Sequence, residues 1–139
     1  MIGIIVAAHG QYAKELLRST SVVFGELHNV AAVTFEPGES VSGLHQKLKE
    51  AMDTLEWSDG VLFLVDLFGG SPYNAASRIA AETENADIVS GVNLPMLVDV
   101  LVGRESEPLS RLGELAIAAG QNSMKSFRSC KTELAEEEL

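Results

Sequence analysis

Cysteine is nearly missing from this chain of 139 residues. The single residue of this type, Cys130, excludes an internal disulfide, and it lies too far from the histidines in sequence to suggest a reactive thiol. No apolar run reaches the length of a membrane span. The first apolar run, at residues 2–8, lacks a preceding basic region and a following cleavage site, so it predicts a strand and not a signal peptide. We therefore expect a cytoplasmic protein with no membrane insertion.

Basic residues are also scarce, because 10 Lys and Arg stand against 20 Asp and Glu and give a net charge of −10. A nucleic-acid-binding protein needs a basic face, so we expect no nucleic-acid partner. Histidine and cysteine pairs with metal-ligand spacing are missing, and we expect no metal. Neither a Walker loop nor a Gly-x-Gly-x-x-Gly motif occurs, which disfavours ATP hydrolysis and dinucleotide binding.

Apolar runs and amphipathic helical patterns alternate along the chain. Strands are predicted at residues 2–8, 30–35, 61–65 and 86–92. Helical stripes are predicted at about 13–24, 41–55, 72–80, 94–102 and 109–119. The alternation predicts an α/β fold, a doubly wound and mainly parallel sheet with helices on both faces. A strand order of 2-1-3-4 is the arrangement we expect.

The chain length and an apolar content of 46% predict a single domain with a real core, which we place at residues 1–127. Residues 128–139 form an acidic C-terminal tail. This tail is a frayed helix, a disordered end or a strand given to a partner subunit. Inside the domain, Ser71 is expected to cap a helix, with Pro72 in the first helical position.

Two polar side chains follow predicted strands at the point where each strand ends. His9 comes directly after the first strand, and Asp66 directly after the third. In the expected strand order these two strands are neighbours, and ligands of open α/β sheets bind at this edge. A neutral imidazole is a nucleophile near neutral pH, and a carboxylate bonded to one ring nitrogen fixes the tautomer. His9 and Asp66 are therefore the candidate catalytic pair.

The residues after Asp66 are suited to an anion. Gly69, Gly70 and Ser71 lead into a helix start, whose free amides favour phosphate, and the glycines allow close backbone approach. Gly10 can offer another amide. Each residue also has a purely structural interpretation: His9 as a hydrogen-bonded strand end, Asp66 as a turn former, and Ser71 as a helix cap.

Four segments resemble one known family. They are Ile-Ile-Val-Ala-Ala-His-Gly at 4–10, Phe-Glu-Pro-Gly-Glu at 35–39, Asp-Leu-Phe-Gly-Gly-Ser-Pro-Tyr-Asn-Ala-Ala-Ser at 66–77 and Ser-Gly-Val-Asn-Leu-Pro-Met-Leu at 90–97. They are similar to the mannose-family enzyme IIA (EIIA) domain of the bacterial phosphoenolpyruvate-dependent sugar phosphotransferase system. The match is collinear from about residue 2 to about residue 127, and the segment at 66–77 is long and specific.

The resemblance implies a phosphocarrier with a phosphohistidine intermediate. His9 matches the histidine that accepts phosphate from phospho-HPr and passes it to a IIB component, which serves sugar uptake through the membrane components IIC and IID. Asp66 matches the aspartate that hydrogen-bonds the histidine ring, and Ser71 the serine near the phosphoryl group. No metal or cofactor is then needed. The resemblance further implies a homodimer in which a C-terminal, antiparallel edge strand is exchanged.

The chain departs from this family in two places. Many relatives carry Thr or Ser before the histidine, where this chain has Ala8, so one hydroxyl donor is absent. Some relatives continue through an Ala/Pro-rich linker into a IIB domain, whereas this sequence stops at Leu139, and a separate IIB protein is expected. The charges of the acidic tail are poor strand formers, which counts against the exchanged strand.

Other functions are compatible with the same residues. The chain can be the IIA-like phosphoryl donor of a phosphotransferase-dependent dihydroxyacetone kinase. It can also be a non-enzymatic regulator whose partner binding depends on phosphorylation of His9. In the simplest case it is an anion-binding α/β module with a structural His9, and such a module predicts no covalent label.

Overall fold

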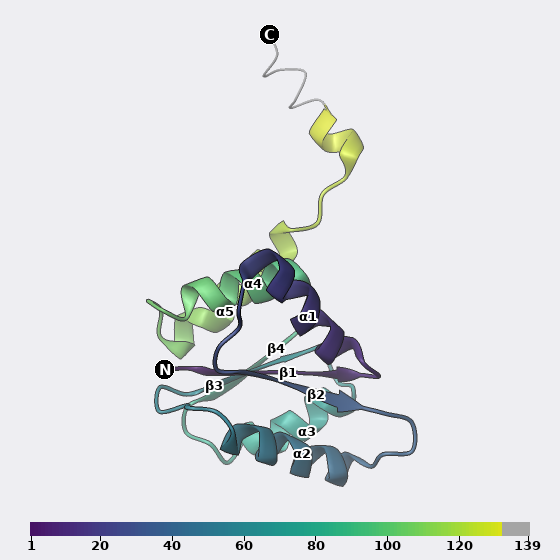
Figure 1. Cartoon of the computed structure of the whole chain (residues 1–139), viewed down its shortest axis with the longest axis vertical. Coiled ribbons are helices and arrows are strands. Elements are labelled where there is room, and N and C mark those ends of the chain that lie inside the picture. The colour runs from purple at the N-terminus through teal and green to yellow at the C-terminus, as the bar shows by residue number, and fades with distance from the viewer. Residues whose placement is uncertain (132–139) are drawn as a thin grey trace.

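The computed structural model describes residues 1–131 and consists of a sheet between two layers of helices (Figure 1). The strands are β1 (Gly3–His9), β2 (Val30–Phe35), β3 (Val61–Val65) and β4 (Ala86–Ser90). The helices are α1 (Tyr12–Phe24), α2 (Val41–Asp53), α3 (Ser71–Ala80), α4 (Leu94–Gly103) and α5 (Leu109–Asn122).

All four strands of the sheet are parallel, and their order is β2-β1-β3-β4, as the sequence predicted. The fourth strand is shorter than expected. It ends at Ser90 because Gly91 turns the chain with a φ of 80°, and the amides of Gly91 and Val92 then donate to the carbonyls of Asp66 and Val65. The segment after β4 is thereby tied to the end of β3.

Side chains of the central strands alternate between two cores. Ile4, Val6 and Ala8 of β1 belong to the core beneath α1, α4 and α5, and Ile5 and Ala7 belong to the core above α2 and α3. Both cores are closed to water, which explains why β1 and β3 are continuously apolar in sequence. The alternation places the side chain of His9 on the α2 and α3 side, since it continues the series of Ile5 and Ala7.

The predicted helix ends are partly correct. Gly25 ends α1, and the side chain of Asn93 caps α4 by accepting from the amide of Met96. The prediction that Ser71 caps α3 is wrong, because Ser71 is the first helical residue and Gly70 holds the cap position without a side-chain hydrogen bond. Helix α2 ends at Asp53, before the expected boundary near residue 55.

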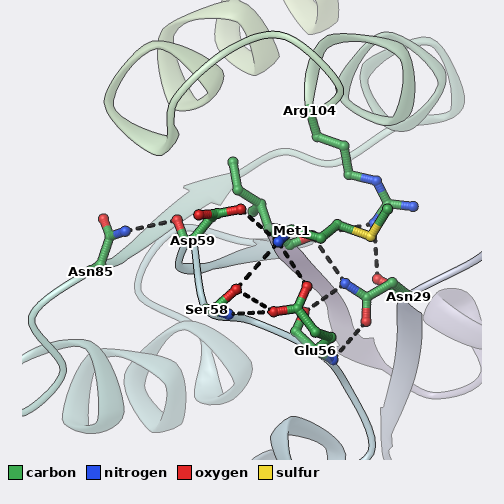
Figure 2. A network of polar contacts seen from close by, with 8 residues as sticks. Met1, Asn29, Glu56, Ser58, Asp59, Asn85 and Arg104 are labelled. Carbon is green, nitrogen blue, oxygen red and sulfur yellow. Dashed lines mark hydrogen bonds and ion pairs between the residues drawn. The ribbon is translucent and has the colours of Figure 1, made fainter.

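A polar network lies at the amino ends of the strands (Figure 2). The ammonium group of Met1 pairs with Glu56 at 2.7 Å and with Asp59 at 2.5 Å. The side chain of Asn29 donates to the carbonyls of Ile2 and Glu56 and accepts from the amide of Glu56 at 2.8 Å. These bonds tie the starts of β1 and β2 to the loop before β3.

Arg104 extends the same network from the end of α4. It is 9% exposed, and its guanidinium donates to the carbonyls of Ile2, His28 and Asn29. In sequence, Arg104 lies in a polar loop after the predicted helical stripe, and no pattern there indicates a role for it. In the structure it connects the helix layer to the starts of two strands.

The last described part of the chain leaves the helix layer after α5 (Figure 1). Residues 127–131 are helical, and residues 132–139 of the predicted tail lie outside the described residues. Within residues 1–131, no helix combines the length and the apolar content that crossing a membrane requires.

Candidate functional site

His9 and Asp66 lie in direct contact at the carboxyl edge of the sheet. The ring nitrogen Nδ1 of His9 is 2.8 Å from Oδ2 of Asp66, and the same oxygen accepts from the backbone amide of His9 at 2.9 Å. The second oxygen, Oδ1, accepts from the amide of Leu67 at 2.9 Å. The pair forms because β1 and β3 are neighbours in register, with Ala7 opposite Val65.

Hydrogen bonding sets the charge of the pair. Partial burial of Asp66 raises its carboxyl pKa, but the bonds from the amide and ring of His9 outweigh that effect and leave the pKa below its ordinary value. A carboxylate only accepts, so Nδ1 must carry the proton in this contact. The lone pair of the neutral ring is then on Nε2. The His9 side chain is 45% exposed, against 16% for Asp66, so the imidazole is accessible and the carboxylate is sheltered.

The start of α3 lies against the imidazole ring. A Cβ atom placed on Gly70 would be 3.1 Å from Cε1 of His9, which is closer than ordinary van der Waals contact. Gly69 has a φ of 79°, a conformation that favours glycine, and turns the chain toward the helix. Within residues 1–131 no hydrogen bond is recorded for the Ser71 hydroxyl, and its backbone amide lies in the first helical turn, where no helical acceptor is available.

Gly10 does not have the free amide that the sequence suggested. Its N–H donates to the carbonyl of Phe35 at 2.8 Å, and the chain passes through it with a φ of 59° before α1 begins at Tyr12. The role of Gly10 is therefore to turn the backbone after His9. The amide of Gly70 is also occupied, by the carbonyl of Leu67 at 3.2 Å.

Ala8 has its side chain on the face opposite to His9. It is fully buried in the core beneath α1, α4 and α5. A hydroxyl at this position would leave the strand on that face, away from the side on which the imidazole lies.

Sequence reasoning gave no role to Phe35, the last residue of β2. Its ring lies against the His9 ring with centroids 5.9 Å apart and planes at 81°. The predicted strand order makes the two strands neighbours, but the contact depends on their register. Residues ending neighbouring parallel strands share a face when they are in register, and His9 pairs with Phe35.

Two exposed apolar side chains follow Asp66 in sequence. Leu67 is 59% exposed and Phe68 is 78% exposed. The Phe68 ring packs on Tyr73 of α3 with centroids 4.8 Å apart. Phe68 and Tyr73 also line a groove of about 470 Å³ that continues along β4 toward Met124. Among residues 1–131, no group of three or more His, Cys, Asp or Glu side chains is placed to hold a metal ion.

Residues 3–117 match the family model described as "PTS system fructose IIA component". The chain is 40% identical over 134 residues to the fructose-specific EIIA component of Bacillus subtilis, covering 96% of this chain and 90% of the relative. It is 39% identical over 135 residues to the mannose-specific EIIAB component of Escherichia coli K12, covering 96% of this chain and 42% of that relative. The chain thus spans less than half the length of that mannose-specific relative.

Solved structures have the same fold. The phosphotransferase system component EIIA from Streptococcus agalactiae superimposes with a TM-score of 0.85 at 28% identity, covering 94% of this chain and 100% of that chain. A PTS IIA protein associated with the fucose utilization operon of Streptococcus pneumoniae gives a TM-score of 0.81 at 32% identity, covering 92% and 94%. The chain belongs to the mannose-family enzyme IIA components of the sugar phosphotransferase system.

Proposed function

We propose that this protein is a cytoplasmic phosphocarrier that accepts a phosphoryl group from phospho-HPr on His9 and passes it to a IIB component. Membership of the enzyme IIA family supports phosphoryl transfer in sugar uptake. The observation that carries the assignment to His9 is the 2.8 Å contact of Nδ1 with Asp66 on a ring that is 45% exposed. This arrangement holds one nitrogen and leaves the other accessible.

The proposed step uses Nε2 of His9 as the nucleophile. Its lone pair forms a bond to phosphorus while the phosphorus–nitrogen bond to the donor histidine breaks and returns its electron pair to the donor ring. Nδ1 keeps its proton throughout, and Asp66 stabilises the positive charge that develops on the imidazole. Since both partners are phosphohistidines of similar transfer potential, positioning and electrostatics suffice and no cofactor takes part.

The phosphoryl oxygens are proposed to contact the start of α3. The Ser71 hydroxyl and amide and the Gly69 amide are the donors, and the positive end of the helix dipole supports them. Gly70 contributes by bringing the backbone close to the His9 ring. Gly10 is left out of this set because its amide is bound to Phe35.

The exposed apolar side chains favour a protein as donor and acceptor. Leu67 and Phe68 are the two residues that follow Asp66 in sequence, and a small phosphorylated metabolite would not need them. Protein interfaces bury apolar and aromatic side chains of this kind. The sugar itself is never bound at this site in the proposed cycle, because the IIB component delivers the phosphate.

We also propose a homodimer in which the chain beyond α5 lies against the edge strand β4 of a partner subunit. Residues 132–139, which belong to the tail where the exchanged strand was expected, lie outside the described residues. The edge of β4 borders the apolar groove, and Met124 and Phe127 are 73% and 74% exposed. In this proposal the domain ends near residue 127, and the tail at 128–139 follows it. Sedimentation of the full chain is expected to give the dimer mass, and a monomer at all concentrations would contradict it.

Labelling tests the assignment to His9. Incubation with phosphoenolpyruvate, enzyme I and HPr is expected to add one acid-labile phosphoryl group, detected by intact mass and mapped by proteolysis. His9→Ala should remain unlabelled. His28→Ala is the matched control, because His28 is 71% exposed in the loop before β2 and should leave labelling unchanged.

Chase with a IIB protein then separates carrier from regulator. Loss of the label to IIB is expected. A His9→Ala protein labelled as well as the wild type would overturn the assignment. A label that never leaves for IIB would instead favour the regulatory function or the donor of a dihydroxyacetone kinase.

A further inference from the structure

We propose that Phe35 and Gly70 are positioning residues that hold the His9 imidazole in one orientation, so that Nε2 always faces the incoming phosphoryl group. This inference rests on the proposed function of His9. The Asp66 bond holds the ring through one atom, Nδ1, and small rotations about the two side-chain torsions can still shift Nε2. Phe35 and Gly70 contact the ring at other places.

The two residues approach the ring from different elements. Phe35, at the end of β2, makes the T-shaped ring contact at 5.9 Å. Gly70, before α3, lies so close to Cε1 that a Cβ atom would be 3.1 Å away. Together with Asp66, which directly follows β3, they restrict the imidazole from three neighbouring segments. The one ring nitrogen that these contacts leave available is Nε2.

Phe35 is itself held firmly in place. Its carbonyl accepts from the Gly10 amide at 2.8 Å, directly after His9. On one side of it, the Lys47 ammonium donates to the Thr34 carbonyl and pairs with Glu39 at 3.1 Å. On the other side, the Glu36 amide donates to Glu39 at 2.8 Å.

These bonds fix the backbone on both sides of Phe35. The hydrogen bond from the Glu36 amide, followed by that from Lys47, keeps the pKa of the Glu39 carboxyl below its ordinary value, so Glu39 stays charged at neutral pH. A rigidly mounted ring can hold a neighbouring ring in position, whereas a mobile one cannot.

The Gly70 position allows a clean test. Its φ of −74° and ψ of 173° are open to any residue, so alanine introduces no backbone strain. The new methyl group would also meet Leu67 only at ordinary contact distances of 3.4 and 3.5 Å. Gly70→Ala therefore perturbs one thing above all, the position of the imidazole.

The first measurement needs no enzymatic activity. Nitrogen NMR of His9 should give a sharp ring signal of the Nδ1–H tautomer in the wild type, and a broadened and shifted ring signal in Phe35→Ala. Phe35→Tyr keeps the aromatic ring and should restore the wild-type spectrum. Unchanged His9 signals in a folded Phe35→Ala protein would overturn the proposal, whatever the activity of the protein.

The second measurement compares two phosphoryl donors. Phosphoramidate is a small chemical donor that needs no protein interface, whereas phospho-HPr must dock. Phe35→Ala is expected to lower the rate about tenfold with both, with kcat falling and KM for phospho-HPr unchanged. Gly70→Ala should give a smaller fall in the same direction. Phe24→Ala, at the far end of α1, is the matched control and should behave as the wild type.

The outcomes are distinguishable from failure of the proposed function. A wild-type protein that neither donor labels at His9 defeats the function, and the NMR result still decides the positioning role. A loss confined to KM for phospho-HPr would make Phe35 a docking residue and overturn the proposal.

Discussion

The two edges of the sheet use polar groups in opposite ways. At the amino edge, Met1, Asn29, Glu56 and Arg104 bond to one another or to backbone carbonyls, and the network joins three strands and a helix (Figure 2). At the carboxyl edge, the side-chain contact of His9 is made with one carboxylate, and Nε2 points to no described partner. The polar groups of the first edge are bonded to one another, whereas the second edge leaves one ring nitrogen open for the reaction that we propose.

This contrast follows from the parallel topology. Parallel strands place all their amino ends at one edge of the sheet, where bonds between loops do not interfere with ligand binding. Their carboxyl ends lie together at the other edge, where helices begin and anions bind. Substitutions at the carboxyl edge should therefore change the rate more than the stability. Substitutions at the amino edge should do the reverse.

Asp66→Asn should produce the largest effect, on rate. An amide at this position can donate to Nδ1 and favour the wrong tautomer, so we expect labelling by phospho-HPr to slow by about 10²-fold or more. Asp66→Ala should also be labelled more slowly and lose its phosphate at a different rate. Quenched-flow labelling measures the rate, and urea unfolding measures the stability. Unchanged rates in both variants would remove Asp66 from the mechanism.

Arg104→Met should produce the largest effect on stability. The substitution keeps an unbranched apolar side chain but leaves the carbonyls of Ile2, His28 and Asn29 without their donor. We expect a loss of about 2–3 kcal/mol in the free energy of unfolding, measured by urea titration, with unchanged labelling of the folded protein. Arg111→Met removes a guanidinium that is 68% exposed and should cost almost nothing. Equal losses in both variants would contradict the role of Arg104.

The comparison also explains what could be predicted from sequence. The order of the strands and the meeting of His9 with Asp66 followed from apolar runs and chain direction, because topology alone brings those residues together. The occupied amide of Gly10 and the ring contact of Phe35 could not be read in this way. They depend on register and on the turn after β1, which no local pattern encodes.

Arg104 illustrates the same limit at the other edge. Its neighbours in sequence, Glu105 and Ser106, suggest a solvated loop, yet the residue is buried because α4 ends above the starts of β1 and β2. A charged side chain is buried only where hydrogen-bond partners are available, and the partners of Arg104 are backbone carbonyls from distant segments. Local sequence patterns do not reveal these partners.

The smallest expected effect is on the pH dependence of the stability, and it comes from the amino edge. The Met1 ammonium, followed by hydrogen bonds from Ser58, lowers the pKa of the Glu56 carboxyl from 4.5 to about 2. A group whose pKa is lowered in the folded state stabilises the fold at any pH above its pKa in the unfolded chain. For Glu56 this contribution is lost as the pH falls from 4.5 toward 2. Glu56→Gln should therefore flatten the decline of the urea midpoint between about pH 6 and about pH 3.

Comparison with the wild type isolates Glu56 in that experiment. Asp66 and Glu39 also have lowered pKa values, so they contribute to the decline in both proteins and cancel in the difference. Glu114→Gln removes a carboxylate that is 78% exposed and should leave the slope unchanged. Because Glu56 is exposed, added salt should shrink the difference, and labelling of His9 should be the same in all three proteins. A Glu56→Gln protein that declines as steeply as the wild type would show that the Met1 ion pair adds no stability to this edge.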